Sequence, residues 1–399
     1  MSEQFDFETL VDRRMQGSLR DSMTDPRLLE KGLPSFMAAE MDFPTAPCIL
    51  DALRKRIDCG IFGFALCDKP YQDAVIRWMK MMRNWEIERD WIVPALGTIF
   101  SLSIAIRAFT APGARVLIQR PVYDRYDQAI IRNERVPLDN PLILREDGHY
   151  EMDFDDLESK MALPDVTLMV LCNPQNPTGT VWKRDDLERL AELAVKHNVV
   201  VFSDEIYAEF CFLDEPVVPF AAIDAAKEIA ISCTGLGKAF NFTGVNHANN
   251  LIPGAALREA FTTQRNRDHY GSIDPIAYTS VLAAYNSDGE WNRAVNQLVL
   301  KNGDLIRAFF RQYLPSVKVA PQEGAFTIWI DWRGLGLSDE QLFQLLEDKA
   351  LIQTNHGSEY GNEGRGFCRM NIATPTVEIE KALQRLLEAA REAGLTSGK

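Results

Sequence analysis

The sequence predicts an α/β protein, with a large domain built on a mainly parallel sheet flanked by helices and a smaller α+β domain. In the middle of the chain, short apolar runs typical of buried strands alternate with amphipathic helices. Such alternation is typical of parallel sheets covered by helices. Beyond residue 285 the pattern changes and indicates a smaller second layer. A length of 399 residues is enough for more than one domain and a large core.

The elements follow from the spacing of apolar residues. The chain up to Pro44 is predicted to be irregular. From there to residue 285, the expected helices are 46–57, 71–83, 99–109 and 185–197, and the expected strands are 91–93, 115–118, 166–172, 199–202 and 229–232. In the C-terminal part, the expected helices are 290–313, 339–346 and 377–392, and the expected strands are 326–330 and 367–372.

Composition and charge exclude several classes of protein. Hydrophobic residues make up 46% and charged residues 25%, which is ordinary for a globular chain and not for a disordered one. The 43 basic and 57 acidic residues give a net charge of −14, with no basic stripe, so neither nucleic acid nor a membrane surface is an expected partner. The longest uncharged run, 239–257, contains four asparagines and a histidine, which argues against a membrane span. Residues 1–10 lack the apolar core of a signal peptide.

Cysteine and histidine usage gives the expected compartment. The chain has seven cysteines, an odd number with loose spacing and no CxxC pair, and we interpret them as buried thiols in a reducing cytoplasm. The five histidines are scattered and form no metal-binding motif, so no metal site is expected.

Four short segments follow predicted strands and are candidates for the chemistry. Ligands of open α/β sheets bind outside the carboxyl ends of the strands, which makes these loops candidates by position alone. The segments are 97–99, 173–179, 203–207 and 234–241.

Lys238 lies in a glycine-rich loop after an apolar strand. A phosphate-binding loop would need a first glycine and a Ser or Thr after the lysine, but the chain has Ser232 and Ala239 at those positions. A lysine with a lowered pKa can instead form a Schiff base. The plain alternative is an exposed loop lysine.

The other candidates also have two interpretations each. Asp204 is either a helix cap or turn residue, or the anionic partner of a buried cation such as a protonated ring nitrogen. Asn176 belongs to a turn-forming Asn-Pro step, although two such steps followed by Thr-Gly exceed what one turn needs. Gly97 before a helix start fits an anion site, but such turns are widespread.

Together these segments resemble the fold-type-I pyridoxal-phosphate (PLP) enzymes of the aminotransferase class I/II superfamily. The resemblance rests on Asn-Pro-x-Asn-Pro-Thr-Gly, Ser-Asp-Glu-x-Tyr and Lys-x-Phe-Asn, in that order, and covers nearly the whole chain. It implies that Lys238 is the Schiff-base lysine and general base, and that Asp204 is the partner of the pyridinium nitrogen. It also implies that Asn176 and Tyr207 donate to the ring oxygen, Asn176 also lying in the substrate site.

The resemblance implies further binding residues. Arg369 would hold the substrate α-carboxylate, where the plain alternative is a solvated surface arginine. Tyr123 would stack on the cofactor ring, unless it is simply a core residue. Gly97, Thr98 and Ile99 would cradle the cofactor phosphate, and Thr234 and Phe64 are the remaining predicted cofactor-binding residues.

Segments 39–43, 60–64 and 361–369 resemble the MalY/PatB branch of carbon–sulfur β-lyases, which includes cystathionine β-lyases. The implied reaction splits cystathionine or a related cysteine S-conjugate into a thiol, pyruvate and ammonia. An aminotransferase on the same fold is the alternative, because both reactions begin in the same way. A PLP-binding regulatory protein is a third possibility, against which the complete set of Lys238, Asp204 and Arg369 argues.

The chain departs from the branch at several positions. Phe64 stands where the branch usually has a tyrosine that reaches the neighbouring subunit's cofactor phosphate, and Tyr207 stands where the lyases commonly have histidine. Serines often found before the lysine are replaced by glycines, and the aminotransferase arginine eight residues after it is absent. The candidate substitutes for these phosphate donors are Thr98, Thr234, Asn246 and His247.

The resemblance also gives the expected organisation. Residues 1–45 form an N-terminal segment that joins the small domain, 46–285 form the large PLP-binding domain, and 286–399 form the small C-terminal domain. The active site is expected to be shared between two subunits of a homodimer, with the Phe64 segment serving the partner's site. The expected ligand is a small amino-acid substrate.

Overall fold

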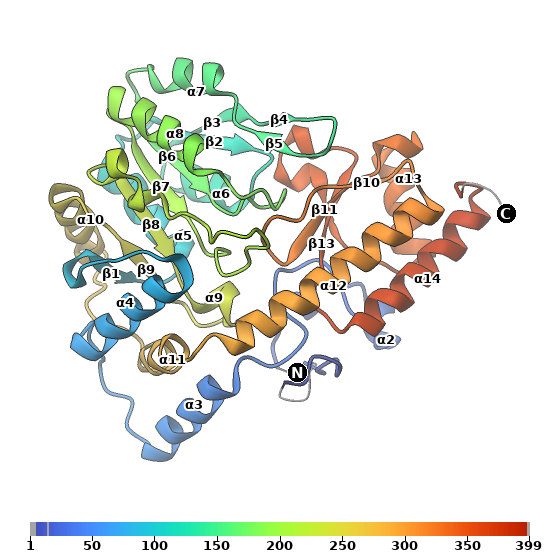
Figure 1. The fold of residues 1–399 in the computed structure, drawn as a ribbon, viewed down its shortest axis with the longest axis horizontal. Coiled ribbons are helices and arrows are strands. Elements are labelled where there is room, and N and C mark those ends of the chain that lie inside the picture. Colours follow the sequence, from blue (N-terminus) through green and yellow to red (C-terminus); the bar gives the residue numbers. More distant parts are fainter. Residues whose placement is uncertain (1–4, 14–15, 397–399) are drawn as a thin grey trace.

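The computed structural model describes residues 5–13 and 16–396. A seven-stranded sheet in the order β1-β9-β8-β7-β6-β2-β3 forms the centre of the larger part (Figure 1). From β8 to β3 all neighbouring strands are parallel, whereas β9 is antiparallel to both β8 and β1. The predicted α/β fold with a mainly parallel sheet is therefore confirmed. The strands are β1 (Ile92–Ala95), β2 (Arg115–Arg120), β3 (Val136–Pro141), β6 (Val166–Cys172), β7 (Val200–Asp204), β8 (Ala230–Thr234) and β9 (Ala248–Leu251).

Helices cover both faces of this sheet because its central strands are apolar on both sides. Along β6, Leu168 and Val170 belong to the buried cluster that includes three helices on one face, while Met169 and Leu171 join the cluster on the other. This alternation is what a fully buried strand requires. The helices of the first face are α5 (Thr98–Phe109), α6 (Arg125–Arg132) and α10 (Ala255–Arg267), and the second face includes α7 (Phe154–Met161) and α8 (Arg184–Lys196).

A second, four-stranded antiparallel sheet lies in the C-terminal part, in the order β10-β11-β13-β12. Helix α12 (Glu290–Tyr313) crosses from the region of the large sheet to this smaller layer and packs on α14 (Thr376–Glu392) (Figure 1). The strands are β10 (Lys318–Val319), β11 (Thr327–Asp331), β12 (Asn355–His356) and β13 (Phe367–Asn371). The proposed domain boundaries at residues 45 and 285 stay a prediction.

The N-terminal segment connects the second sheet with the loop that contains Lys238. The backbone N–H of Asn371 donates to the Phe36 carbonyl at 2.8 Å, so the segment runs beside β13. The side-chain oxygen of Asn241 accepts from Met41 N–H at 2.9 Å, three residues after Lys238. Residues 36–43 therefore form one wall of the space between the two sheets.

The remaining elements complete the cover of the two sheets. Helices α3 and α4 both pack on α11, and β4 pairs with β5 in a separate two-stranded sheet. The bounds are α3 (Pro47–Cys59), α4 (Lys69–Arg83), α9 (Leu236–Ala239), α11 (Pro275–Tyr285), α13 (Asp339–Phe343), β4 (Ile143–Leu144) and β5 (Tyr150–Glu151).

Several predicted elements need correction. The N-terminal part is not wholly irregular, because Ser18 and Asp25 cap two short helices, α1 (Leu19–Met23) and α2 (Pro26–Glu30). The helix predicted over 339–346 ends as α13 at Phe343 and continues as a π-helix, Gln344–Lys349. Strand β7 extends to Asp204, so this carboxylate is the last residue of the strand.

The cysteines are free thiols, as expected, but not all are buried. Cys172, Cys233 and Cys368 are buried, whereas Cys59 at the end of α3 is exposed. The prediction of burial is therefore wrong for Cys59, and Cys48, Cys67 and Cys211 are only half-buried. Within residues 5–13 and 16–396, none of the helices combines the length and apolarity that crossing a membrane needs.

Candidate active site

Three candidate residues come together at the carboxyl ends of neighbouring parallel strands. Asn176 follows β6, Asp204 ends β7, and Lys238 lies in the short helix α9 after β8. Arg369 reaches the same place from β13 of the second sheet, because its guanidinium contacts Asn176. The topology thus assembles residues that lie far apart in the sequence.

Lys238 is held close to the N-terminal segment. Its Nζ donates to the Ala39 carbonyl at 2.7 Å and lies 6.0 Å from the centroid of the Tyr207 ring. Burial and, to a smaller extent, the positive charge of Arg369 together lower the pKa of Lys238 to about 8. Near pH 8 a large share of this amine is therefore neutral, which a nucleophile or general base needs.

Gly235, three residues before Lys238, lies where two backbone segments approach closely. A Cβ atom at this position would lie 2.9 Å from the His247 carbonyl oxygen, which belongs to the backbone and cannot rotate away. The close approach of these two segments therefore favours glycine over any residue with a Cβ atom at this position.

Asp204 is a buried carboxylate without a cation. Its side chain is 5% exposed, Oδ2 accepts from the Tyr126 hydroxyl at 2.6 Å, and Oδ1 accepts from Ile206 N–H at 3.2 Å. Burial raises the pKa of Asp204. Among the described residues no ion pair involves this carboxylate. A buried carboxylate is stabilised by a cationic partner, so the site favours a positively charged group beside Asp204.

Arg369 is the complementary case, a buried guanidinium without a carboxylate. It is 4% exposed, which excludes the interpretation as a solvated surface arginine. Nη1 donates to Asn176 Oδ1 at 3.0 Å, and Nη2 donates to Asn355 Oδ1 at 2.6 Å and to the Met37 carbonyl at 3.1 Å. All of these acceptors are neutral, and Nε has no partner in the part of the chain that the structure describes. The arrangement leaves a positive charge that an anionic ligand would balance.

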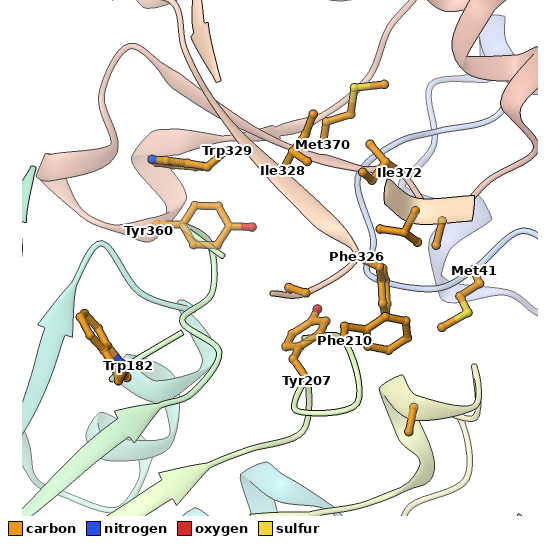
Figure 2. Close-up of a cluster of buried hydrophobic side chains, with 14 of the residues drawn as sticks. Met41, Trp182, Tyr207, Phe210, Phe326, Ile328, Trp329, Tyr360, Met370 and Ile372 are labelled. Atoms are coloured by element: carbon orange, nitrogen blue, oxygen red, sulfur yellow. The ribbon is translucent and has the colours of Figure 1, made fainter. Parts of the chain in front are cut away.

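Tyr207 presents an unsatisfied hydroxyl to the same space. Its side chain is 3% exposed, and its hydroxyl oxygen has no hydrogen-bond partner within residues 5–13 and 16–396. Figure 2 shows the hydroxyls of Tyr207 and Tyr360 turned toward the same region below β11. Burial raises the pKa of Tyr207, so the phenol stays protonated and can donate. An orphaned donor of this kind is typical of a ligand site.

The predicted phosphate turn has the required backbone geometry. Gly97 has φ = 93°, which glycine adopts readily, and it precedes α5 without a side-chain cap. The first N–H groups of α5, at Thr98 and Ile99, are therefore available to an anion, as expected for a helix start. Tyr123 is half-buried, and its ring meets that of Tyr126 edge-on at 5.8 Å.

Two of the candidate phosphate donors have other partners. The Thr234 hydroxyl accepts from Arg83 Nη2 at 2.8 Å, which leaves its own proton free to donate. His247 Nε2 lies 2.5 Å from the Tyr71 hydroxyl, and burial lowers the pKa of His247 to about 4, so this ring is neutral. Asn246 is exposed.

Phe64 is separated from this site. Its side chain is 94% exposed, in a segment that also exposes Ile61, Phe62 and Leu66. It therefore contributes nothing to the buried site of its own subunit.

Sequence reasoning missed several residues around the site. Tyr126 holds Asp204, Asn355 holds Arg369, and Arg83 forms buried ion pairs with Glu205 at 2.8 Å and Glu209 at 3.2 Å. Glu205 directly follows Asp204, so this cluster lies behind the site. Each of these contacts joins distant parts of the chain, and the sequence offers no local signal for them.

Comparisons with known proteins agree with this geometry. The chain is 36% identical over 358 residues to cystathionine beta-lyase PatB of Bacillus subtilis (strain 168), covering 90% of this chain and 92% of the relative. It is 31% identical to protein MalY of Escherichia coli (strain K12), covering 97% and 99% of the two chains. A solved structure of cystalysin from Treponema denticola, which contains a pyridoxal 5'-phosphate cofactor, superposes with a TM-score of 0.93 at 29% identity, covering 98% and 99%.

The model of the family 'aminotransferase class I and II' matches residues 35–386, which is most of the chain. The predicted resemblance is therefore confirmed, and this protein belongs to the aminotransferase class I and II family.

Proposed function

We propose that this protein is a pyridoxal-phosphate-dependent carbon–sulfur β-lyase that cleaves cystathionine or a related cysteine S-conjugate. With one water consumed, the products are a thiol, pyruvate and ammonia. The observation that carries the proposal is the set of incompletely paired groups around one site, namely the Lys238 amine, the Asp204 carboxylate and the Arg369 guanidinium. The name of the relative PatB, a cystathionine beta-lyase, supports the same chemistry, and the similar structure of cystalysin contains pyridoxal 5'-phosphate.

The residues present fit the cofactor. Asp204 lacks a paired cation, and a protonated ring nitrogen would supply one. The buried Tyr207 hydroxyl lacks an acceptor, and the ring oxygen of the cofactor would accept its hydrogen bond. Asn176 is buried and close to Arg369, so its amide N–H groups are available to the same oxygen. Thr98 and the uncapped start of α5 fit a phosphate.

The chain's own groups divide the reaction between them. When bound, pyridoxal phosphate supplies a protonated ring that accepts the electron pair left on the substrate α-carbon. Asp204 keeps the ring nitrogen protonated, because a buried anion stabilises the adjacent cation. Lys238 Nζ takes the α-proton as general base and can return a proton to the sulfur that leaves from the β-carbon.

Arg369 determines which bond reacts. Its guanidinium binds the α-carboxylate of the amino acid, and its contact with Asn176 fixes that position relative to the ring. Tyr123, which lies half-buried beside Tyr126, would stack on the cofactor ring. The remaining predicted residues have two roles. We assign Thr234 and the backbone donors at Gly97 and Ile99 to the cofactor phosphate, and Phe64 to the partner's site.

Assembly and location complete the proposal. We propose a homodimer in which the exposed Phe64 segment reaches the partner's site, since four large apolar side chains there are more than half exposed in one subunit: Ile61 (68%), Phe62 (53%), Phe64 (94%) and Leu66 (63%). A cytoplasmic location agrees with seven free cysteines. Residues 46–285 would carry the cofactor, and residues 286–399 would contribute the carboxylate-binding arginine.

Product analysis tests the function and separates it from transamination. Purified protein with pyridoxal phosphate and cystathionine, without any 2-oxo acid, should release pyruvate and thiol at a steady rate. Aminotransferases are also relatives of the chain, for example the aspartate aminotransferase of Pyrococcus abyssi at 26% identity. Turnover that starts only after addition of a 2-oxo acid, with amino transfer to it, would contradict the lyase proposal.

A further inference from the structure

The Tyr126 hydroxyl is the strongest polar contact of the Asp204 carboxylate. It donates to Asp204 Oδ2 at 2.6 Å, whereas the contact from Ile206 N–H to Oδ1 measures 3.2 Å. Tyr126 is 1% exposed and Asp204 is 5% exposed, so water does not compete for this bond. A short hydrogen bond to an ionised group in a dry site is among the stronger ones in proteins.

From this geometry we infer that Tyr126 is a positioning residue that keeps the proton on the cofactor ring nitrogen rather than on Asp204. The inference rests on the proposed function. A carboxylate and a ring nitrogen that share one proton form two states, one with the proton on nitrogen and one with it on oxygen. A donor on the carboxylate stabilises the ionised oxygen, and so it favours the state with the protonated ring.

The surroundings of Asp204 make this donor necessary. Burial raises the pKa of Asp204, which by itself would move the shared proton toward the carboxylate. Cys172 and Cys233 lie nearby and stay neutral, since burial raises the pKa of both thiols. At longer range, the cation that acts on Asp204 among the described residues is Lys238. Tyr126 and the Ile206 amide therefore supply the direct opposing contacts.

Tyr126 is well suited to this role because it always donates. Burial and the adjacent Asp204 charge raise the pKa of its phenol well above the usual value, so the hydroxyl keeps its proton. Helix α6 fixes the side chain, since Tyr126 lies in its first turn and its N–H donates to the Tyr123 carbonyl at 3.1 Å. Tyr126 thus contacts both Tyr123, which would stack on the cofactor ring, and Asp204, which would pair with the ring nitrogen.

The test is the ¹⁵N resonance of ring-labelled pyridoxal phosphate bound to the wild type and to Tyr126→Phe. The wild type should show a protonated ring nitrogen. In Tyr126→Phe the resonance should move toward the unprotonated form, and kcat should fall roughly tenfold with KM almost unchanged. That fold-change is the size expected for one charge-assisted hydrogen bond.

Tyr150→Phe is the matched control. Tyr150 is also buried, at 5% exposed, and its hydroxyl accepts from Trp329 Nε1 at 3.1 Å, away from Asp204. This variant should lose comparable stability and keep the wild-type resonance. An unchanged resonance in Tyr126→Phe would overturn the inference while leaving the proposed function intact. A wild type that binds no cofactor at Lys238 would instead overturn the proposed function.

A second measurement applies if Tyr126→Phe does not fold. Fluorotyrosine at position 126 keeps the ring and the donor, and its ¹⁹F resonance reports on the hydrogen bond to Asp204. This resonance should shift when pyridoxal phosphate binds, because the charge partner of Asp204 changes. A ¹⁹F resonance that does not respond to the cofactor would also overturn the inference.

Discussion

Asn176 and Arg369 touch across the two sheets, with Arg369 Nη1 donating to Asn176 Oδ1 at 3.0 Å. One residue follows β6 of the large sheet, and the other belongs to β13 of the small sheet. The Asn176 side chain, which would bind the ring oxygen of the cofactor, therefore also positions the Arg369 guanidinium, which would bind the substrate carboxylate. In the proposed function, cofactor binding and substrate orientation would therefore be linked through this contact.

Replacement of Arg369 by lysine should lower kcat/KM. A lysine cannot form the planar two-point contact with a carboxylate, and the loss of a charge-assisted hydrogen bond costs about 1.5–3 kcal/mol, or roughly 10- to 100-fold. Steady-state kinetics with a cysteine S-conjugate measure the effect. Arg333→Lys is the control, since Arg333 pairs with Asp331 and is 53% exposed. Equal losses in the two variants would show that Arg369 has no special role.

Capture of pyridoxal phosphate by the apoprotein should depend on pH with an apparent pKa of about 8. The neutral amine is the reactive form, so the rate should rise with pH, and it should level off above about 8 because burial lowers the pKa of Lys238. A free lysine analogue, with an ordinary pKa near ~10.4, should keep gaining rate at higher pH. Stopped-flow absorbance measures both. If the rate of capture by the protein keeps rising with pH in parallel with that of the analogue, the lowered pKa of Lys238 is contradicted.

Removal of Arg83 should destabilise the fold. Its guanidinium pairs with Glu205 and Glu209, and all three side chains are at most 1% exposed. Arg83→Met leaves two carboxylates buried without their cation, which costs about 3–5 kcal/mol. Thermal unfolding measures the change. Arg89→Met breaks the exposed contact with Asp73 and should cost at most about 1 kcal/mol. Similar melting temperatures for the two variants would exclude a structural role for the buried cluster.

Phe64→Tyr should increase affinity for pyridoxal phosphate. In the proposed dimer the added hydroxyl would reach the partner's phosphate, and one hydrogen bond to a charged group corresponds to roughly tenfold in Kd. Fluorescence titration of the apoprotein measures this affinity. Leu66→Tyr adds the same side chain at a neighbouring position that is 63% exposed, and it should leave Kd unchanged. Equal affinities of Phe64→Tyr and wild type would place the segment away from the phosphate.

The sequence predicted the elements that depend on local pattern. The apolar run 166–172 and the long amphipathic helix 290–313 have the expected bounds as β6 and α12. Burial on both faces of a strand gives a continuous apolar run, and burial along one stripe of a helix gives a helical periodicity. Strand β9 was missed because its residues include the polar pair Asn249 and Asn250. Asn250 is buried only because its amide donates to the Val93 carbonyl and the Ser101 hydroxyl, both at 3.0 Å.

The site itself could be predicted only in part. Lys238, Asp204, Asn176 and Arg369 were found by resemblance, and the structure brings their side chains to one space. The contacts that hold these residues in place could not be predicted. Tyr126, for example, contacts Asp204 although the two residues are 78 positions apart in the sequence. Hydrogen bonds between distant elements leave no periodic pattern, so only a three-dimensional structure shows them.

The most direct test of the account is the site of covalent attachment. Holoprotein is reduced with borohydride, digested and mapped by mass spectrometry, with Lys238→Ala treated in parallel. We predict a single pyridoxyl-modified peptide that contains Lys238, and no modified peptide from the variant. Modification of a different lysine, or an adduct that persists in Lys238→Ala, would contradict the account.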